Sequence, residues 1–169
     1  MKRLHLLRHA KSSWDDETLP DRERPLAPRG IRASGRMAEH IAGADLGVEL
    51  VLCSPARRAR DTLEPVLPAL GADVQVRTEP AVYGADAAEL LEIVRGLPEE
   101  VGSALLVGHN PGLESFAQRL AAKGESLGKL AKKYPTGALA SFELDVDHWR
   151  EADLGGARLE SFVRPRRLE

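Results

Sequence analysis

Three short segments of the chain together supply histidine and arginine side chains in a pattern suited to phosphate chemistry. Arg8 and His9 lie in "LLRHAKS", three arginines lie in "SPARRARDT" (54–62), and His109 lies in "GHNPG" (108–112). Guanidinium groups bind phosphate oxygens through paired hydrogen bonds, and imidazole nitrogens can add further donors. Brought together, these groups would form a positive site the size of a phosphate group.

Each segment follows a short apolar run, and these runs predict how the segments are brought together. The runs are "LHLL" (4–7), "LVLC" (50–53) and "ALLVG" (104–108). Continuous apolarity over so few residues is typical of strands buried on both faces, as in a parallel sheet. Because ligands bind beyond the carboxyl ends of the strands in open α/β sheets, we expect the three segments to meet at one edge.

Helical patterns separate the predicted strands. Residues 29–42 and 113–121 carry apolar side chains at helical spacing, and residues 86–97 begin with Asp86 and Glu89, a variant of the capping box. The predicted apolar faces consist of Ile31, Ala38, Ile41 and Ala42 in the first of these helices, and of Leu113, Phe116, Ala117, Leu120 and Ala121 in the second.

Alternating strands and helices predict an α/β fold, a three-layer α/β/α sandwich with a mostly parallel central sheet. Residues 140–146 and 157–163 are predicted to form late strands on or near an edge. Pro65 and Pro68 are expected to end or kink any helix around them. No linker or internal repeat divides the sequence, so we expect one domain over residues 1–169.

Two helix starts are predicted at the same edge of the sheet. Ser54-Pro55 and Asn110-Pro111 each fit an N-cap residue followed by proline at the first helical position. The free N–H groups of a helix N-terminus favour anions and would reinforce the arginines.

The composition argues against several classes of protein. Of 169 residues, 24 are Lys or Arg and 26 are Asp or Glu, for a net charge of -2, so a general nucleic-acid or membrane binder is not expected. The single cysteine, Cys53, excludes an internal disulfide framework. No apolar run approaches the roughly 20 residues that span a bilayer, and the first residues are too few and too polar for a signal peptide. We expect a cytoplasmic protein.

Each of these residues also has a purely structural explanation. The arginines of residues 54–62 would suit the solvated face of a helix, and a lone Arg-His pair often ends a strand at the surface. The coincidence of three strand ends with the same groups favours a site. Residues without such neighbours are predicted to be structural or solvated: His5, His40, His148, Lys123, Lys129, Lys132 and Lys133.

The motifs resemble those of a known family. They occur in the order and at the spacing of the histidine phosphatase superfamily, and are similar in particular to its short branch, the SixA-type phosphohistidine phosphatases. The usual triplet Arg-His-Gly is Arg-His-Ala here, with Ala10 after the reacting groups. The resemblance implies a phosphoglycerate mutase-like fold and a phosphatase. The motifs that carry it are "LLRHAKS", "RPLAPRG", "SPARRARDT", "VYGADAAELL", "LLVGHNPGLE" and "YPTGALASFEL".

The resemblance also implies a role for each site residue. His9 would be the nucleophile and would form a phosphohistidine intermediate. Arg8 and Arg58, the latter favoured over Arg57 by the pattern "RARDT", would clamp the phosphoryl oxygens. His109 would donate to the phosphoryl group and to the leaving group. Further candidate phosphate-binding residues are Lys11, Ser12 and Asn110. No cofactor is expected, and no residues form a recognisable set of metal ligands.

A general acid is harder to assign. Larger branches of the superfamily supply a carboxylate from the region after the third strand, where Glu79 is the nearest candidate. Asp16 is the second candidate, with Asp15 and Asp21 as alternatives in the same loop. A site with no dedicated acid would suit a P–N bond, which breaks readily once its nitrogen is protonated, better than an alkyl phosphate ester. That favours phosphohistidine on a protein as the substrate.

Other functions fit the sequence less well. A cysteine phosphatase needs Cys-x5-Arg, but Ala59 stands where Cys53 would require the arginine, and no Gly-x4-Gly-Lys-Ser/Thr loop is present. A phosphoglycerate mutase would need extra segments over the pocket. A phosphatase of small phosphorylated metabolites and a non-catalytic phosphate-binding adaptor are the alternatives. The predicted partner is a phosphorylated protein, such as a histidine phosphotransfer domain, or a small phosphorylated metabolite, with a monomer as the default.

Overall fold

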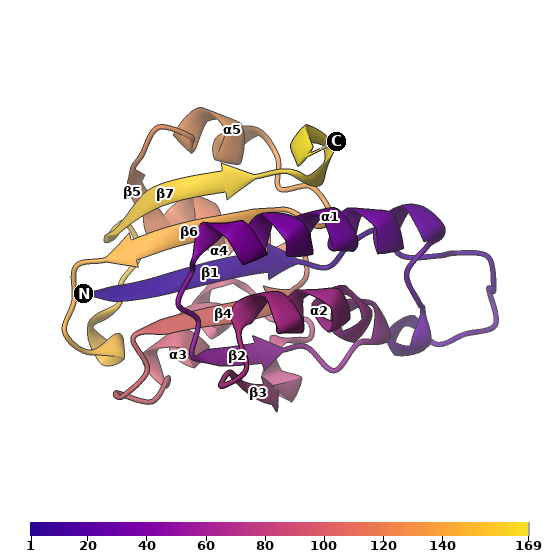
Figure 1. The fold of residues 1–169 in the computed structure, drawn as a ribbon. Coiled ribbons are helices and arrows are strands. Elements are labelled where there is room, and N and C mark those ends of the chain that lie inside the picture. The colour runs from indigo at the N-terminus through magenta and orange to yellow at the C-terminus, as the bar shows by residue number, and fades with distance from the viewer. Residues whose placement is uncertain (169) are drawn as a thin grey trace.

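A seven-stranded sheet forms the centre of the computed structural model, which describes residues 1–168 (Figure 1). In spatial order its strands are β3 (Gln75–Thr78), β2 (Leu50–Cys53), β4 (Ser103–Gly108), β1 (Lys2–Arg8), β6 (Leu139–Leu144), β7 (Ala157–Val163) and β5 (Ala121–Lys123). All neighbouring pairs are parallel except β1–β6 and β6–β7. The prediction of an α/β fold with a mostly parallel sheet is confirmed.

Helices cover both faces of the sheet (Figure 1). On one face lie α1 (Pro28–Ala44) and α2 (Arg57–Leu70), and on the other lie α3 (Ala87–Arg95), α4 (Gly112–Leu120) and α5 (Leu127–Lys132). The part of the chain that the structure describes also contains four short 3-10 helices: η1 (Asp21–Glu23), η2 (Pro80–Val82), η3 (Trp149–Glu151) and η4 (Pro165–Leu168). Within residues 1–168, no helix is long and apolar enough to cross a membrane.

The central strands are apolar on both sides because both sides are covered. In β1, Leu4 and Leu6 pack with Phe116 of α4, whereas Leu7 packs with Met37 of α1. The same alternation in β2 and β4 explains the uninterrupted apolar runs. Since β1, β2 and β4 run parallel, the polar segments that follow them meet at one edge of the sheet.

The helices on the α3 side match their predicted patterns. Asp86 and Glu89 form a reciprocal capping box at the start of α3. The predicted apolar face of α4 is buried up to Leu120, where the helix ends, and Ala121 already belongs to β5.

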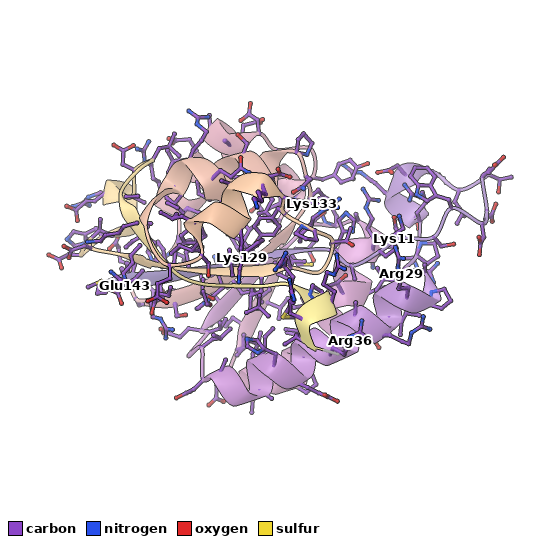
Figure 2. All side chains as sticks on the ribbon, turned by 90° about the horizontal axis from the view of Figure 1, so that it is seen from above. Lys11, Arg29, Arg36, Lys129, Lys133 and Glu143 are labelled. Carbon is purple, nitrogen blue, oxygen red and sulfur yellow. The ribbon has the colours of Figure 1, made fainter. Side chains whose placement is uncertain are left out.

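The buried face of α1 differs from the prediction. Ile31 is 60% exposed, because the residues that pack on the sheet recur every fourth position at Ala33, Met37 and Ile41. Ala42 is likewise exposed. Arg29 and Arg36, two turns apart, lie on the side of α1 near the yellow C-terminal segment in Figure 2.

Two further predictions need correction. Pro65 and Pro68 do not end α2, which continues through both to Leu70. Both prolines are at least partly exposed, so the backbone carbonyls that lose an intrahelical hydrogen bond can turn toward water. Of the two late strands predicted to lie on or near an edge, β7 lies next to the edge strand β5, as predicted, whereas β6 pairs with β1 on one side and β7 on the other and lies inside the sheet. The edges are formed by β3 and β5.

Candidate active site

The loop after β1 is held between the ends of its two neighbouring strands. The backbone N–H of His9 donates to the carbonyl oxygen of Gly108 in β4 (3.1 Å), and that of Arg8 donates to Ala138 just before β6 (3.1 Å). The N–H of Gly137 donates to the carbonyl oxygens of both Arg8 (3.0 Å) and His9 (2.9 Å). These hydrogen bonds fix the backbone of both residues at the edge of the sheet.

The ring of His9 is oriented by the same loop. Nδ1 lies 2.7 Å from the carbonyl oxygen of Ala10, and since a carbonyl oxygen can only accept, Nδ1 carries the hydrogen. Nε2 of the neutral ring therefore holds a lone pair. The N–H of Ala10 donates to Thr62 Oγ1 (2.9 Å), whose hydroxyl donates to the carbonyl oxygen of Arg58 (2.7 Å), so the loop is tied to α2.

The surroundings of His9 keep its ring neutral. Burial lowers the pKa of His9 to about 3, with smaller contributions in the same direction from His109, Arg58 and Arg8. The hydrogen bond to Ala10 opposes this shift and is outweighed. At pH 7 the imidazole is therefore uncharged, which is the form in which Nε2 can attack phosphorus.

We expect the His9 ring to resist protonation in the folded protein well below pH 6.5, its ordinary pKa. Ring-nitrogen NMR between pH 7 and pH 5 should leave the His9 signal unchanged, with His9→Asn providing the assignment. In the unfolded chain the His9 ring takes up a proton below about pH 6.5, whereas the folded protein does not. As the pH is lowered below this value, the free energy of unfolding of the wild-type protein should therefore fall, relative to that of His9→Asn, by up to about 1.4 kcal/mol per pH unit. A titration midpoint near pH 6.5 would contradict this assignment.

His109 lies opposite His9 at the end of β4, with the two ring centroids 5.1 Å apart. Its Nε2 is 2.6 Å from the hydroxyl oxygen of Ser54, which follows β2. Its Nδ1 is buried and has no hydrogen-bond partner within residues 1–168. Burial, followed by the charge of Arg58, lowers the pKa of His109 to about 4, so this ring is also neutral at pH 7. A neutral ring still carries one N–H that can donate a hydrogen bond.

Arg58 is the buried arginine of α2. Its side chain is 10% exposed and donates to the carbonyl oxygen (2.8 Å) and to Oδ2 (2.9 Å) of Asp21 in η1. Arg57 is 49% exposed and pairs with Asp61 on the outside of the helix, at 3.6 Å. The charge of Arg58 also acts on both His9 and His109, which places Arg58 beside the two histidines.

Asp21 is held in its ionised form by three donors. Its Oδ2 accepts from the hydroxyl of Tyr83 (2.5 Å) and from Arg58, and its Oδ1 accepts from Arg24 (3.1 Å). The Tyr83 hydrogen bond, followed by those of the two arginines, lowers the pKa of Asp21 to about 2. At neutral pH this carboxylate has no proton to donate. It holds Arg58 in place, together with Tyr83, whose ring meets His109 edge-on at 5.5 Å.

Arg8 has an unused donor in the site. Its Nη1 donates to the carbonyl oxygen of Tyr134 (2.9 Å), but its Nε is buried and without a hydrogen-bond partner in the described part of the chain. Leaving a buried N–H unpaired is costly, and an oxygen of a bound anion would satisfy it. Asn110, by contrast, donates to Glu114 (2.9 Å) and to Tyr134 (3.1 Å), which uses both of its amide hydrogens.

The carboxylates proposed as general acids are engaged elsewhere. Asp16 accepts hydrogen bonds from the hydroxyl (2.6 Å) and N–H (3.0 Å) of Thr18 in an exposed loop. Glu79 accepts from the N–H of Ala81 (3.1 Å) at the start of η2. Asp15 is exposed in the same loop as Asp16. No hydrogen bond or ion pair within residues 1–168 joins these carboxylates to the histidine pair.

For two further predicted phosphate-binding residues, no hydrogen bond within residues 1–168 leads to the histidine pair. The hydroxyl of Ser12 accepts from Arg24 (2.7 Å). Lys11 is exposed and lines a hollow with Arg29 on the side of α1. Burial raises the pKa of the Cys53 thiol to about 12, in agreement with the interpretation of this residue as inert. Among the described residues, no group of three or more His, Cys, Asp or Glu is placed to hold a metal ion.

The predicted helix caps are displaced along the chain. α2 begins at Arg57 rather than after Ser54, whose hydroxyl accepts from the N–H of Ala56 (3.2 Å) and also contacts His109. α4 begins after Pro111, and the side-chain oxygen of Asn110 accepts from the N–H of Glu114 (3.2 Å). Both side chains therefore satisfy backbone donors near a helix start, but neither is the residue that directly precedes the helix.

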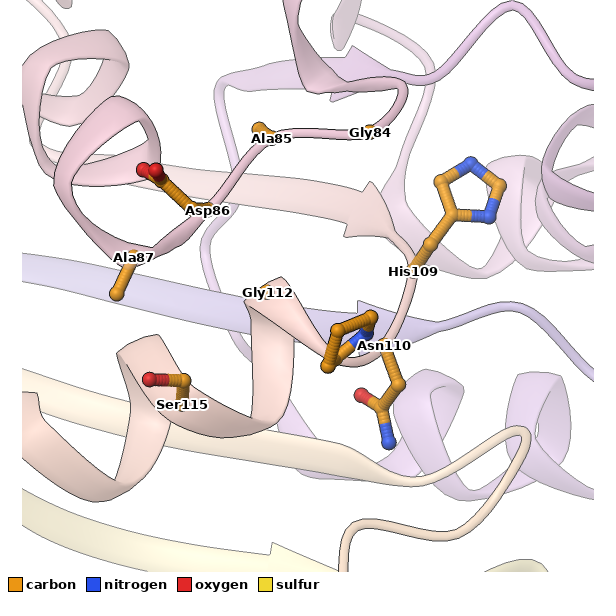
Figure 3. A pocket seen from close by; sticks show the side chains of 9 residues that line it. Gly84, Ala85, Asp86, Ala87, His109, Asn110, Gly112 and Ser115 are labelled. Carbon is orange, nitrogen blue, oxygen red and sulfur yellow. The ribbon is translucent and has the colours of Figure 1, made fainter.

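A cavity of about 330 Å³ lies next to His109, between the starts of α3 and α4 (Figure 3). Among the described residues, Asp86 is the one charged residue that lines it, and its side chain already caps α3. The close approach of the two segments requires glycine at position 112, since a Cβ there would lie 1.8 Å from the carbonyl oxygen of Ala85. The cavity is lined by Gly84, Ala85, Asp86, Ala87, His109, Asn110, Pro111, Gly112 and Ser115.

Sequence reasoning missed the residues that position this site. Tyr83 lies within a motif quoted above, "VYGADAAELL", and an aromatic residue inside that motif was the available signal. The pairing of Asp21 with Arg58 joins residues 37 positions apart, and no local pattern predicts it. The contact of Ser54 with His109 likewise joins two strand ends.

A known protein family combines these features. The sequence profile of the histidine phosphatase superfamily (branch 1) matches residues 4–140. The chain is 30% identical over 143 residues to the phosphohistidine phosphatase SixA of Escherichia coli, covering 83% of this chain and 84% of that protein. It is 35% identical over 164 residues to the uncharacterized protein Rv1276c of Mycobacterium tuberculosis, covering 95% of this chain and all of that one.

Solved structures agree with the sequence relatives. The structure of a putative phosphohistidine phosphatase SixA from Nakamurella multipartitia has a TM-score of 0.81 at 28% identity and covers 97% of this chain and 96% of its own. The protein histidine phosphatase SixA complexed with tungstate has a TM-score of 0.80 at 26% identity, with 99% of both chains covered. The chain belongs to the histidine phosphatase superfamily, within its SixA-type branch, and has the predicted phosphoglycerate mutase-like fold. This membership supports a phosphatase.

Proposed function

We propose that this protein hydrolyses phosphohistidine on another protein, with His9 as the nucleophile. The observation that carries the proposal is the state of His9: a buried, neutral ring whose Nδ1–H is bound to the Ala10 carbonyl, which leaves the Nε2 lone pair free. Arg8, Arg58 and His109 surround it, so the transferring phosphoryl group would meet both positive charge and a neutral donor.

The reaction then proceeds in two steps. The Nε2 lone pair of His9 forms a bond to phosphorus while the P–N bond of the substrate breaks, and the leaving imidazole nitrogen takes a proton from solvent. The neutral ring of His109 donates a hydrogen bond to a phosphoryl oxygen in this step. The His9 ring becomes cationic, and its Nδ1–H donates more strongly to the Ala10 carbonyl. A water oxygen next attacks phosphorus, the bond to Nε2 breaks, and the water proton passes to His109 or to solvent, which restores the neutral ring.

The carboxylates of the site support a phosphoramidate as the substrate. Asp21 is ionised at neutral pH, and Asp16 and Glu79 accept hydrogen bonds outside the histidine pair. A serine alkoxide is a poor leaving group that needs a proton donor, whereas the imidazole of phosphohistidine leaves once protonated. The names of the SixA relatives point to the same substrate class, and tungstate, found in one of their structures, is a tetrahedral oxyanion like phosphate.

We expect kcat/KM for a phosphohistidine peptide to exceed that for the matched phosphoserine peptide by at least about 100-fold, since about 3 kcal/mol separates a protonated from an unassisted leaving group. Both peptides are assayed with the wild-type protein at equal ionic strength. Equal rates on the two peptides would overturn the proposal in favour of a general phosphomonoesterase.

Carboxylate variants are the controls for this comparison. Asp16→Asn and Glu79→Gln should leave phosphohistidine hydrolysis within about 2-fold of wild type, because neither side chain contacts the histidine pair. Asp21→Asn should lower the rates on both peptides alike, because it loosens Arg58 rather than removing an acid. Collapse of hydrolysis in Asp16→Asn or Glu79→Gln would identify a conventional general acid.

A further inference from the structure

A group of basic side chains beside the active site has no part in the chemistry above. Two adjoining hollows of about 270 Å³ and 330 Å³ share Pro135, Arg164 and Arg166 in their linings. We call the basic residues of both hollows the basic surface. They are Lys11, Arg29, Arg36, Lys129, Lys132, Lys133, Arg164, Arg166 and Arg167.

The basic surface concentrates positive charge in one region of a chain whose net charge is -2. Within residues 1–168, neither hollow is lined by a carboxylate. Apart from Arg36, none of its side chains forms an ion pair with a described carboxylate, although the chain pairs its acids and bases elsewhere. Clustered like charges repel one another in the isolated protein, so a ligand that neutralises them gains free energy on binding.

The fold joins the basic surface to the catalytic loop. Lys11 is two residues from His9 and belongs to both. Gly137, which binds the carbonyl oxygens of Arg8 and His9, packs against Pro165, since a Cβ at Gly137 would lie 2.9 Å from the Pro165 ring. The arginines on either side of Pro165 are thereby held next to the loop.

The basic surface extends over several elements. In Figure 2, Lys11 and Arg29 lie at the start of α1, Lys129 and Lys133 lie on the α5 side, and the yellow C-terminal segment lies between α1 and α5. This spread exceeds what one phosphoryl group can contact. The matching ligand is an extended anion that reaches the basic surface while its phosphoryl group occupies the His9 site.

We propose that the basic surface docks an acidic protein surface that surrounds the phosphohistidine of the substrate. This inference rests on the proposed function and adds the chemistry of the partner to it. Carboxylates flanking the phosphohistidine would pair with the lysines and arginines of α1, α5 and η4, and would lower KM without changing the chemical step.

Two phosphohistidine peptides test the proposal directly, one with four flanking glutamates and one with glutamines in their place. The glutamate peptide should have a KM about 10-fold lower at equal kcat, and raising the salt concentration should remove the difference. The double variant Lys133→Glu/Arg166→Glu should lose this preference and keep the wild-type rate on the glutamine peptide. Equal KM values for the two peptides in the wild-type protein would overturn the proposal.

A matched control separates the position of the charges from their net change. The double variant Arg158→Glu/Lys123→Glu makes the same change in charge at exposed positions on β7 and β5, at the other end of the sheet, and should keep the preference for the glutamate peptide.

Fluorescence anisotropy of a labelled glutamate peptide without phosphate measures docking independently of hydrolysis. If the wild-type protein binds this peptide and Lys133→Glu/Arg166→Glu does not, docking is supported, whether or not the phosphopeptides are hydrolysed. Absence of hydrolysis of both phosphopeptides would refute the proposed function but not the docking. Tighter binding of a single-stranded oligonucleotide than of the peptide would identify a nucleic-acid surface instead.

Discussion

Replacing His9 with alanine is expected to lower kcat on a phosphohistidine peptide by on the order of 10⁴-fold or more, the usual consequence of removing a catalytic nucleophile. Within the described residues of the site, His9 is the only neutral histidine whose ring is held by a backbone hydrogen bond, from Nδ1 to the Ala10 carbonyl. The variant removes this ring and with it the lone pair of Nε2. Single-turnover and steady-state assays at pH 7 measure the loss.

The fold should survive this substitution. The backbone of His9 is held by Gly108 and Gly137, and neither hydrogen bond involves the ring. Circular dichroism should therefore match the wild-type spectrum. The matched control is His148→Ala, which removes an exposed imidazole paired with Glu99 and should retain full activity. Near-normal turnover by His9→Ala with a native spectrum would refute the mechanism.

The second large effect is expected at Arg58. Its replacement by glutamine should cost about 2 to 4 kcal/mol of transition-state stabilisation, seen as a fall in kcat/KM of about 30- to 900-fold. The guanidinium is buried beside both histidines and held by Asp21, so its charge acts on the phosphoryl oxygens in surroundings that screen it poorly.

Arg57→Gln is the matched control for Arg58→Gln. The two arginines are neighbours in the same helix, but the side chain of Arg57 is 49% exposed and pairs with Asp61, so its loss should change kcat/KM by less than about 3-fold. If Arg57→Gln were the more damaging variant, the assignment of the phosphate clamp to Arg58 would be wrong.

The sequence was sufficient to predict the layers and the edge of the sheet where the site lies. Apolar runs such as 50–53 and 104–108 are uninterrupted because helices cover both faces of β2 and β4. Burial on both faces can therefore be predicted from a few consecutive residues. The gathering of Arg8, Arg58 and His109 followed from parallel strands ending at one edge. The position of β6 inside the sheet did not follow, because strand order depends on pairings between distant segments.

Contacts between distant residues account for most of what the sequence did not reveal. Asp21 was one of several loop carboxylates, and only the approach of Tyr83 and Arg58 makes it an ionised anchor rather than an acid. Asn110 was predicted to bind phosphate, but the carbonyl oxygen of Tyr134 takes one of its amide hydrogens. Such assignments depend on which partners the fold supplies.

The central claim is that the phosphoryl group passes through His9. The most direct measurement is rapid acid-free quenching of the wild-type protein with a ³²P-labelled phosphohistidine peptide, followed by mapping of the labelled enzyme fragment. We predict a transient label on His9 that is stable to alkali and lost in acid, as a phosphorylated imidazole is, and absent from His9→Ala but present in His148→Ala. Turnover without any labelled enzyme, or a label that persists in His9→Ala, would contradict the mechanism.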